Sequence, residues 1–273
     1  MIRPPAVAGT FYPANAEELA RGVDALLARA LAGAEAGMGG VAEGGAAAYV
    51  VPHAGHRFSG ATAAHVYARL RAGADGISRV VLAGPSHRVP LLGCVVPTAT
   101  QWSTPLGRVP VDVDGCAALA AAGYARPDDA PHAPEHSLEV QLPFLQRVLP
   151  GTVPVLPIAV GVSTVEAVAQ VIAAAVALEP PGTVVLCSTD LSHYLDEASA
   201  QSQDSRTEQA ILALDAAGIG VRDACGVFAL RGLLGWARFE NLEAARLHRC
   251  TSADLTGDRS RVVGYGAFAF RRR

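Results

Sequence analysis

The stretch Arg79-Val-Val-Leu-Ala-Gly-Pro-Ser-His-Arg-Val-Pro90 decides the fold. Its apolar, β-branched run from Val80 to Ala83 is typical of a strand that is buried on both faces. A Gly-Pro pair ends this strand, and His87 follows on the turn. Because ligands of open α/β sheets bind outside the carboxyl ends of the strands, His87 is placed for chemistry.

The same pattern recurs elsewhere in the chain. The run Ala47–Val51 is followed by His53, and the run Thr183–Cys187 is followed by Asp190 and His193. A further apolar run, Val153–Val160, ends in glycine. Since three of these four predicted strands deliver a histidine at the carboxyl end, the sequence predicts one shared pocket.

Helical segments alternate with the predicted strands, which indicates a single α/β domain over residues 1–273. We expect three layers, with a central, mostly parallel sheet flanked by helices. A hairpin insertion is predicted from Cys94–Thr100 and Gly107–Val113, joined by Trp102–Leu106. The segment Pro131–Glu139 is expected to enter a helix that runs to Val148, with Ser137 as its cap and with Pro143 bending the helix or ending its first part. Gly33–Gly45 is expected to be a surface loop.

Composition excludes several functions. All 22 basic residues are arginine, so lysine Schiff-base chemistry and a P-loop lysine are excluded. A net charge of −3 argues against a nucleic-acid partner. The longest apolar stretch, Val165–Leu178, is too short to span a membrane. The five scattered cysteines and the absence of a signal-peptide pattern predict a cytoplasmic protein.

The predicted pocket contains His53, His87, Asp190 and His193. Two histidines and one anionic ligand with open positions are the set that holds Fe(II) for oxygen chemistry, and zinc for hydrolysis uses similar ligands. A histidine off the metal serves as acid or base. We expect Asp190 to accept a hydrogen bond from His193 and fix its tautomer.

Seven short motifs follow one another along the chain: Gly9-Thr-Phe-Tyr-Pro13, Pro52-His-Ala-Gly55, Gly84-Pro-Ser-His87, Trp102-Ser-Thr-Pro-Leu106, Glu135-His-Ser-Leu-Glu139, Ser188-Thr-Asp-Leu-Ser-His193 and Cys225-Gly226. In this order they resemble the Memo family, called system protein B of the AmmeMemoRadiSam set in prokaryotes. The resemblance covers nearly the whole chain.

The resemblance implies a fold similar to that of class III extradiol ring-cleavage dioxygenases. It also implies metal ligation by His53, His87 and Cys225, so that a thiolate replaces the carboxylate of the dioxygenases. His193 then matches their acid/base histidine, with Asp190 beside it. The implied cofactor is a divalent transition metal, Fe(II) above all, with copper or zinc as alternatives.

Four further residues are predicted to contact substrate, each with an alternative. His56 stands where the family often has an aromatic residue, and it contacts either the metal or the substrate. Trp102 is either a pocket wall or part of the hairpin packing. Glu135 and His136 either face the pocket or only begin a helix.

Three functions remain open at this point. The first is a metal-dependent redox or dioxygenase-like enzyme of unknown substrate, the second a metal-binding or interaction protein without turnover, and the third a zinc-dependent hydrolase. The expected ligand is a small molecule or a peptide. The resemblance also implies a radical-SAM protein and a small AMMECR-like protein as partners.

Overall fold

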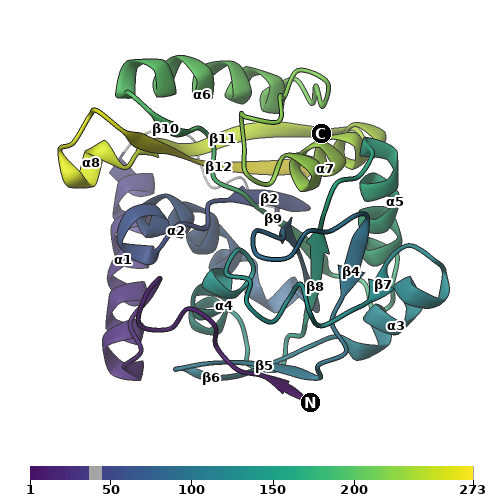
Figure 1. Ribbon diagram of the computed structural model, residues 1–273. Coiled ribbons are helices and arrows are strands. Elements are labelled where there is room, and N and C mark those ends of the chain that lie inside the picture. The colour runs from purple at the N-terminus through teal and green to yellow at the C-terminus, as the bar shows by residue number, and fades with distance from the viewer. Residues whose placement is uncertain (37–44, 273) are drawn as a thin grey trace.

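A central sheet organises the chain in the computed structural model, which describes residues 1–36 and 45–272 (Figure 1). The strands of this sheet are, in spatial order, β10 (His193–Leu195), β12 (Val262–Arg272), β2 (Ala48–Val51), β9 (Thr183–Ser188), β3 (Arg79–Pro85), β8 (Val155–Val160), β4 (Cys94–Val96) and β7 (Arg126–Pro127). Strand β11 (Leu242–Thr251) also pairs with β12.

The middle of the sheet is parallel. Strands β2, β9, β3 and β8 run in the same direction, with Tyr49 opposite Leu186 and Val81 opposite both Val185 and Leu156. All residues of these strands are buried, apart from a partly exposed Thr183. Continuous apolar runs suit such strands because both faces are covered. The predicted α/β class and the four predicted strands are confirmed.

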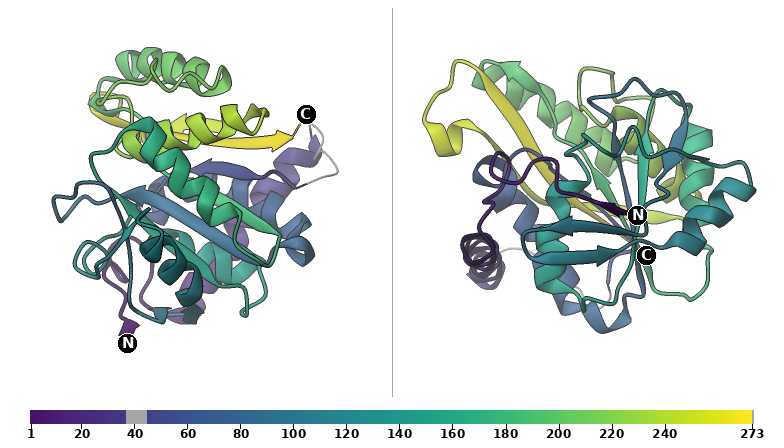
Figure 2. Two further views of the ribbon diagram at one scale, coloured as in Figure 1. Left: turned by 90° about the vertical axis from the view of Figure 1, so that its right-hand side faces the viewer. Right: turned by 60° about the horizontal axis from the view of Figure 1, so that its bottom comes forward.

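Helices cover both faces of the parallel strands and make three layers (Figures 1 and 2). One layer contains α1 (Ala16–Ala36), α2 (His56–Ala72) and α4 (Leu142–Val148), which pack on one another. The opposite layer contains α3 (Val113–Ala121), α5 (Val165–Val176) and α7 (Val227–Phe239).

Helix α6 (Glu197–Leu212) packs on β11 and β12, at the antiparallel end of the sheet. The short helices η1 (Ala74–Gly76) and α8 (Ala253–Thr256) lie in connections. In the described part of the chain, no helix is both long and apolar enough to cross a bilayer. The predicted loop Gly33–Gly45 is shortened by α1, which continues to Ala36, and residues 37–44 lie outside the described residues.

The predicted hairpin exists and its second arm is confirmed, but the predicted first arm is wrong. Its arms are β5 (Gln101–Thr104) and β6 (Gly107–Pro110), which form a small sheet with β1 (Ile2–Arg3). The predicted first arm instead contributes β4, which pairs antiparallel with β8. Trp102 therefore lies in a strand of the hairpin and not in its connection.

The predicted helix that ends at Val148 is confirmed, but its predicted cap is wrong. The segment after Pro131 runs through turns into the short 3₁₀ helix η2 (Glu139–Gln141), and α4 begins at Leu142. Pro143 stands in the first turn of α4, where its missing N–H costs no hydrogen bond. The Ser137 hydroxyl caps no helix; it donates to the carbonyl of Pro85, at the end of β3.

Candidate metal centre

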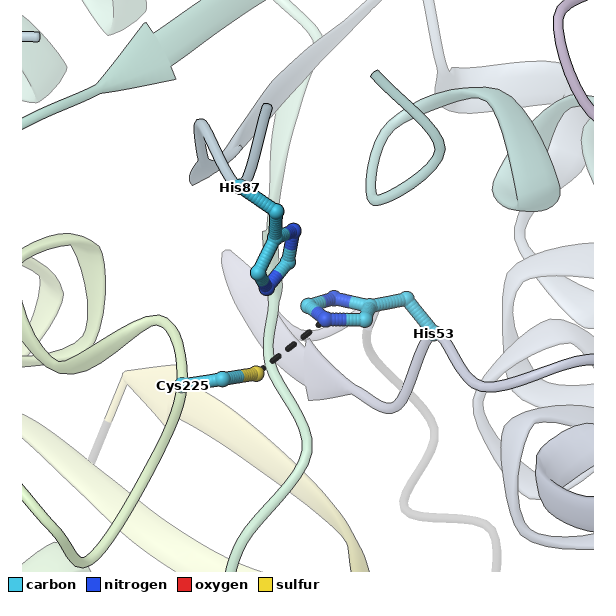
Figure 3. Close-up of side chains that lie close together, drawn as sticks. All are labelled: His53, His87 and Cys225. Atoms are coloured by element: carbon cyan, nitrogen blue, oxygen red, sulfur yellow. Dashed lines mark hydrogen bonds between the residues drawn. The ribbon is translucent and has the colours of Figure 1, made fainter. Parts of the chain in front are cut away.

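Three side chains from distant parts of the chain meet at the carboxyl edge of the sheet (Figure 3). His53 follows β2, His87 follows β3, and Cys225 lies on the loop before α7. One ring nitrogen of each histidine and the Cys225 sulfur all lie within 4.8 Å of one another. The Cys225 Sγ is 3.1 Å from His53 Nε2. The structure therefore brings together the three predicted metal ligands.

Close backbone contact holds Cys225 at this position. The N–H of Gly226 donates to Thr189 Oγ1 at 2.9 Å, and the N–H of Asp190 points to the Cys225 sulfur at 3.3 Å. A Cβ atom on Gly226 would lie 2.9 Å from the carbonyl oxygen of Ser188. Glycine is therefore required for the loop to approach the end of β9 this closely.

The buried Glu135 carboxylate orients the His87 ring through Nδ1. Its carboxylate accepts a hydrogen bond from His87 Nδ1 at 2.9 Å and others from the backbone of His136 and Ser137. Burial would raise the pKa of Glu135, but hydrogen bonds from His136, His87 and Ser137 hold it far below its usual range. Because an ionised carboxylate only accepts, His87 carries its proton on Nδ1 and leaves Nε2 free for a ligand.

His193 is oriented by the backbone and not by Asp190, which corrects the prediction. Its Nδ1 donates to the carbonyl of Leu191 at 2.8 Å, so Nε2 is the basic nitrogen. The Asp190 carboxylate instead accepts the backbone N–H groups of His53 at 2.7 Å and Ala54 at 3.3 Å. Side-chain donor atoms of Asp190, His193 and Cys225 still lie within 4.8 Å of one another.

Burial keeps two of the three ligand side chains, His53 and Cys225, uncharged when no metal is bound. Burial, with the nearby His87 and His136, lowers the pKa of His53 well below its usual value. Burial, with the nearby Asp190, raises the pKa of Cys225 to about 12. The thiol therefore stays protonated at neutral pH, whereas a bound cation would deprotonate it.

The donor set fits a transition metal. Bonds of about 2.1 Å to nitrogen and 2.3 Å to sulfur place tetrahedral ligands roughly 3.5 Å apart. The Cys225 sulfur lies 3.1 Å from His53 Nε2, and all three donor atoms lie within 4.8 Å of one another, so small shifts of the side chains would complete this geometry. Two imidazoles and one thiol also leave coordination positions for a further ligand.

The amino-acid sequence is similar to that of a known protein family. The family model described as Memo-like protein matches residues 3–269. The chain belongs to the Memo family.

Other members of the Memo family are similar over their whole length. A MEMO1 family protein of Methanopyrus kandleri is 36% identical over 295 residues, which cover 100% of both chains. MEMO1 family proteins of Aeropyrum pernix and Ignicoccus hospitalis are 35% and 36% identical. The alignments cover 97% and 99% of this chain, and 98% and 99% of those proteins.

The four residues predicted to contact substrate occupy different places in this Memo-family protein. The His136 ring lies 4.6 Å from that of His87 and 5.4 Å from that of His53, between centroids, so it stays a candidate. Glu135 is 1% exposed, and its carboxylate contacts His87 Nδ1. Its predicted contact with substrate stays a prediction.

His56 and Trp102 serve in packing. The His56 ring lies between Tyr12 and Phe144, and its Nε2 donates to the carbonyl of Val140 at 2.8 Å. Trp102 is 1% exposed and lies under the guanidinium of Arg3. These contacts support packing roles for both rings, and their predicted contact with substrate stays a prediction.

Sequence reasoning missed the groups behind His53. Its Nδ1 lies 3.0 Å from the hydroxyl of Ser188, which also contacts Gln141. Ser188 begins the motif that also contains Asp190 and His193. This position in the motif could have indicated that Ser188 lies at the site. Gln141 carries no such signal, because a glutamine at the start of a helix is ordinary.

Proposed function

We propose that this Memo-family protein binds a divalent transition metal, Fe(II) above all, through His53, His87 and Cys225, and performs redox chemistry on a small molecule. The meeting of these three donor groups carries the proposal. Two histidines and one anionic donor, with positions left open, are typical of non-haem iron sites that activate oxygen. A bound iron would supply the oxygen chemistry.

The protein's own residues would bind substrate and move protons. A ring nitrogen of His193 lies within 4.8 Å of the Cys225 sulfur, and Nε2 is the nitrogen without a proton, so His193 is placed to accept a proton from a substrate hydroxyl at the centre. His136 lies next to both metal-ligand histidines. This arrangement supports the dioxygenase-like chemistry that the family resemblance implies.

Metal identity tests the proposal most directly. Thiolate also suits copper and zinc, so the protein should be purified without oxygen and its metals determined by elemental analysis. Oxygen uptake would then be followed with a catechol as the probe. Iron together with uptake supports the proposal, and zinc without uptake supports hydrolysis. Metal without any turnover supports a binding protein.

The proposal extends to the location of the protein and to its partners. All five cysteines are free, which supports a reducing, cytoplasmic location. The family resemblance supports a radical-SAM protein and an AMMECR-like protein as partners, and a small molecule or peptide as ligand. Co-purification of the tagged full chain from its own cells would test both partners.

A further inference from the structure

The hydroxyl of Ser188 stands at the centre of a buried hydrogen-bond network behind His53. It has three neighbours: the carbonyl oxygen of Ser137 at 2.6 Å, Nε2 of Gln141 at 2.9 Å and Nδ1 of His53 at 3.0 Å. A hydroxyl has one proton to donate and two lone pairs to accept. The three contacts therefore use its whole capacity.

The direction of each hydrogen bond follows from its partner. The Ser137 carbonyl only accepts, so it receives the single proton of Ser188. The Gln141 amide also donates to the carbonyl of Pro52 at 2.9 Å, and its oxygen receives the Tyr67 hydroxyl at 2.7 Å. These two contacts fix the amide with its NH₂ group toward Ser188.

One proton position remains to be assigned. Because the Ser188 proton is used and Gln141 donates, the contact with His53 can form only if Nδ1 donates to the hydroxyl. The neutral ring then has its lone pair on Nε2, which is the nitrogen that faces Cys225 at 3.1 Å. The thiol proton points to that lone pair when no metal is bound.

Burial of the whole network leaves no alternative to this assignment of the His53 proton to Nδ1. Ser188 and Tyr67 are completely buried, Gln141 is 1% exposed, and His53 is 2% exposed. Solvent therefore cannot replace a missing partner, and an unpaired polar group here costs about 1–3 kcal/mol. His87 has a different support, because an ionised carboxylate holds its Nδ1.

We propose that Ser188 and Gln141 are positioning residues that fix His53 in its Nδ1-protonated tautomer and aim its Nε2 at the metal position. The proposal rests on the proposed metal centre for its role, whereas the tautomer itself is a property of the metal-free protein. Partners of this kind typically change metal affinity roughly ten- to hundredfold.

The test uses Ser188→Ala in the full chain. Ser59→Ala is the matched control, because the Ser59 hydroxyl is equally buried and donates only to the carbonyl of Ala54. Nitrogen NMR of metal-free, ¹⁵N-histidine-labelled protein, with His53 assigned from His53→Ala, should show Nδ1 protonation in the parent. Ser188→Ala should shift His53 toward Nε2 protonation, and Ser59→Ala should not.

Metal affinity is the second measurement. Anaerobic competition with a chelator, with Zn²⁺ and Fe²⁺ as probes, should show roughly ten- to hundredfold weaker binding for Ser188→Ala than for Ser59→Ala. If Ser188→Ala does not fold, Gln141→Met replaces it, with a smaller loss in the same direction. Nε2 protonation in the parent, or equal affinities of the two serine variants, would overturn the proposal. If His53→Ala binds metal like the parent, the metal centre fails while the NMR result still decides the tautomer.

Discussion

Each of the three histidines that follow a strand has an acceptor at Nδ1. The acceptors are the Ser188 hydroxyl for His53, the Glu135 carboxylate for His87 and the Leu191 carbonyl for His193. All three rings consequently offer the Nε2 lone pair. Their roles differ by position and not by tautomer. His53 and His87 form one donor group with Cys225, whereas His193 groups with Cys225 and Asp190.

Because of this difference in position, alanine variants of His53 and His193 should differ in metal binding. His53→Ala should lose bound metal, whereas His193→Ala should keep metal near stoichiometry and change the binding of a catechol or nitric oxide probe. Metal content, circular dichroism and probe titrations at several pH values check both. If His193→Ala gives the parent's probe affinity and pH profile, its acid/base role is wrong.

The role of Cys225 as a metal ligand can also be tested by substitution. Cys225→Ser should weaken metal binding at least tenfold and remove the charge-transfer absorption of a thiolate–metal bond, since an alcohol is a poor ligand for a soft site. Cys250→Ser is the control, because that cysteine is also partly exposed but contacts Thr62 instead. Equal spectra of the two loaded variants would contradict ligation by Cys225.

At the scale of elements, the loop before α7 must come very close to the end of β9. Gly226→Ala would bring its Cβ to 2.8 Å from the Cβ of Thr189 and 2.9 Å from the Ser188 carbonyl. Since backbone must move to relieve this contact, Cys225 should shift away from His53. We expect metal binding to weaken at least tenfold while the fold is retained.

Metal titration together with circular dichroism measures the effect of Gly226→Ala. Gly151→Ala is its control, because a Cβ at Gly151 meets nothing within 4 Å. If Gly226→Ala binds metal like Gly151→Ala, the close approach of this loop is not needed for the site.

At the scale of the whole molecule, a buried ion pair ties the N-terminal arm to the segment that supports the site. Arg3 contacts the Glu139 carboxylate at 2.6 Å and donates to the carbonyl of Glu135 at 2.7 Å. Both side chains of the pair are almost completely buried. The same carboxylate accepts the Tyr12 hydroxyl, so the arm is anchored at two points.

Arg3→Ala should therefore lower the free energy of unfolding by about 3–5 kcal/mol, because it leaves a buried carboxylate without its cation. Arg21→Ala, which removes an exposed pair with Glu17, should cost less than about 0.5 kcal/mol. Urea unfolding followed by circular dichroism measures both. Equal midpoints for the two variants would show that the arm contributes little to stability.

Several features of this protein are determined by the sequence alone. The α/β class and the strands β2, β3, β8 and β9 were predictable because apolar runs and their Gly or Pro ends are local signals. The positions of His53 and His87 at one sheet edge followed, since parallel strands end together. Seven ordered motifs were enough to predict the family.

Only the tertiary structure decided which side chains meet. Cys225 reaches His53 through a close contact of Gly226 with β9, and Glu135 turned out to support His87 from inside the protein. Trp102 pairs in a separate small sheet, where packing and not periodicity chose its partner. These contacts join residues far apart in the chain, and their free energy depends on packing and on buried hydrogen bonds that no local pattern encodes.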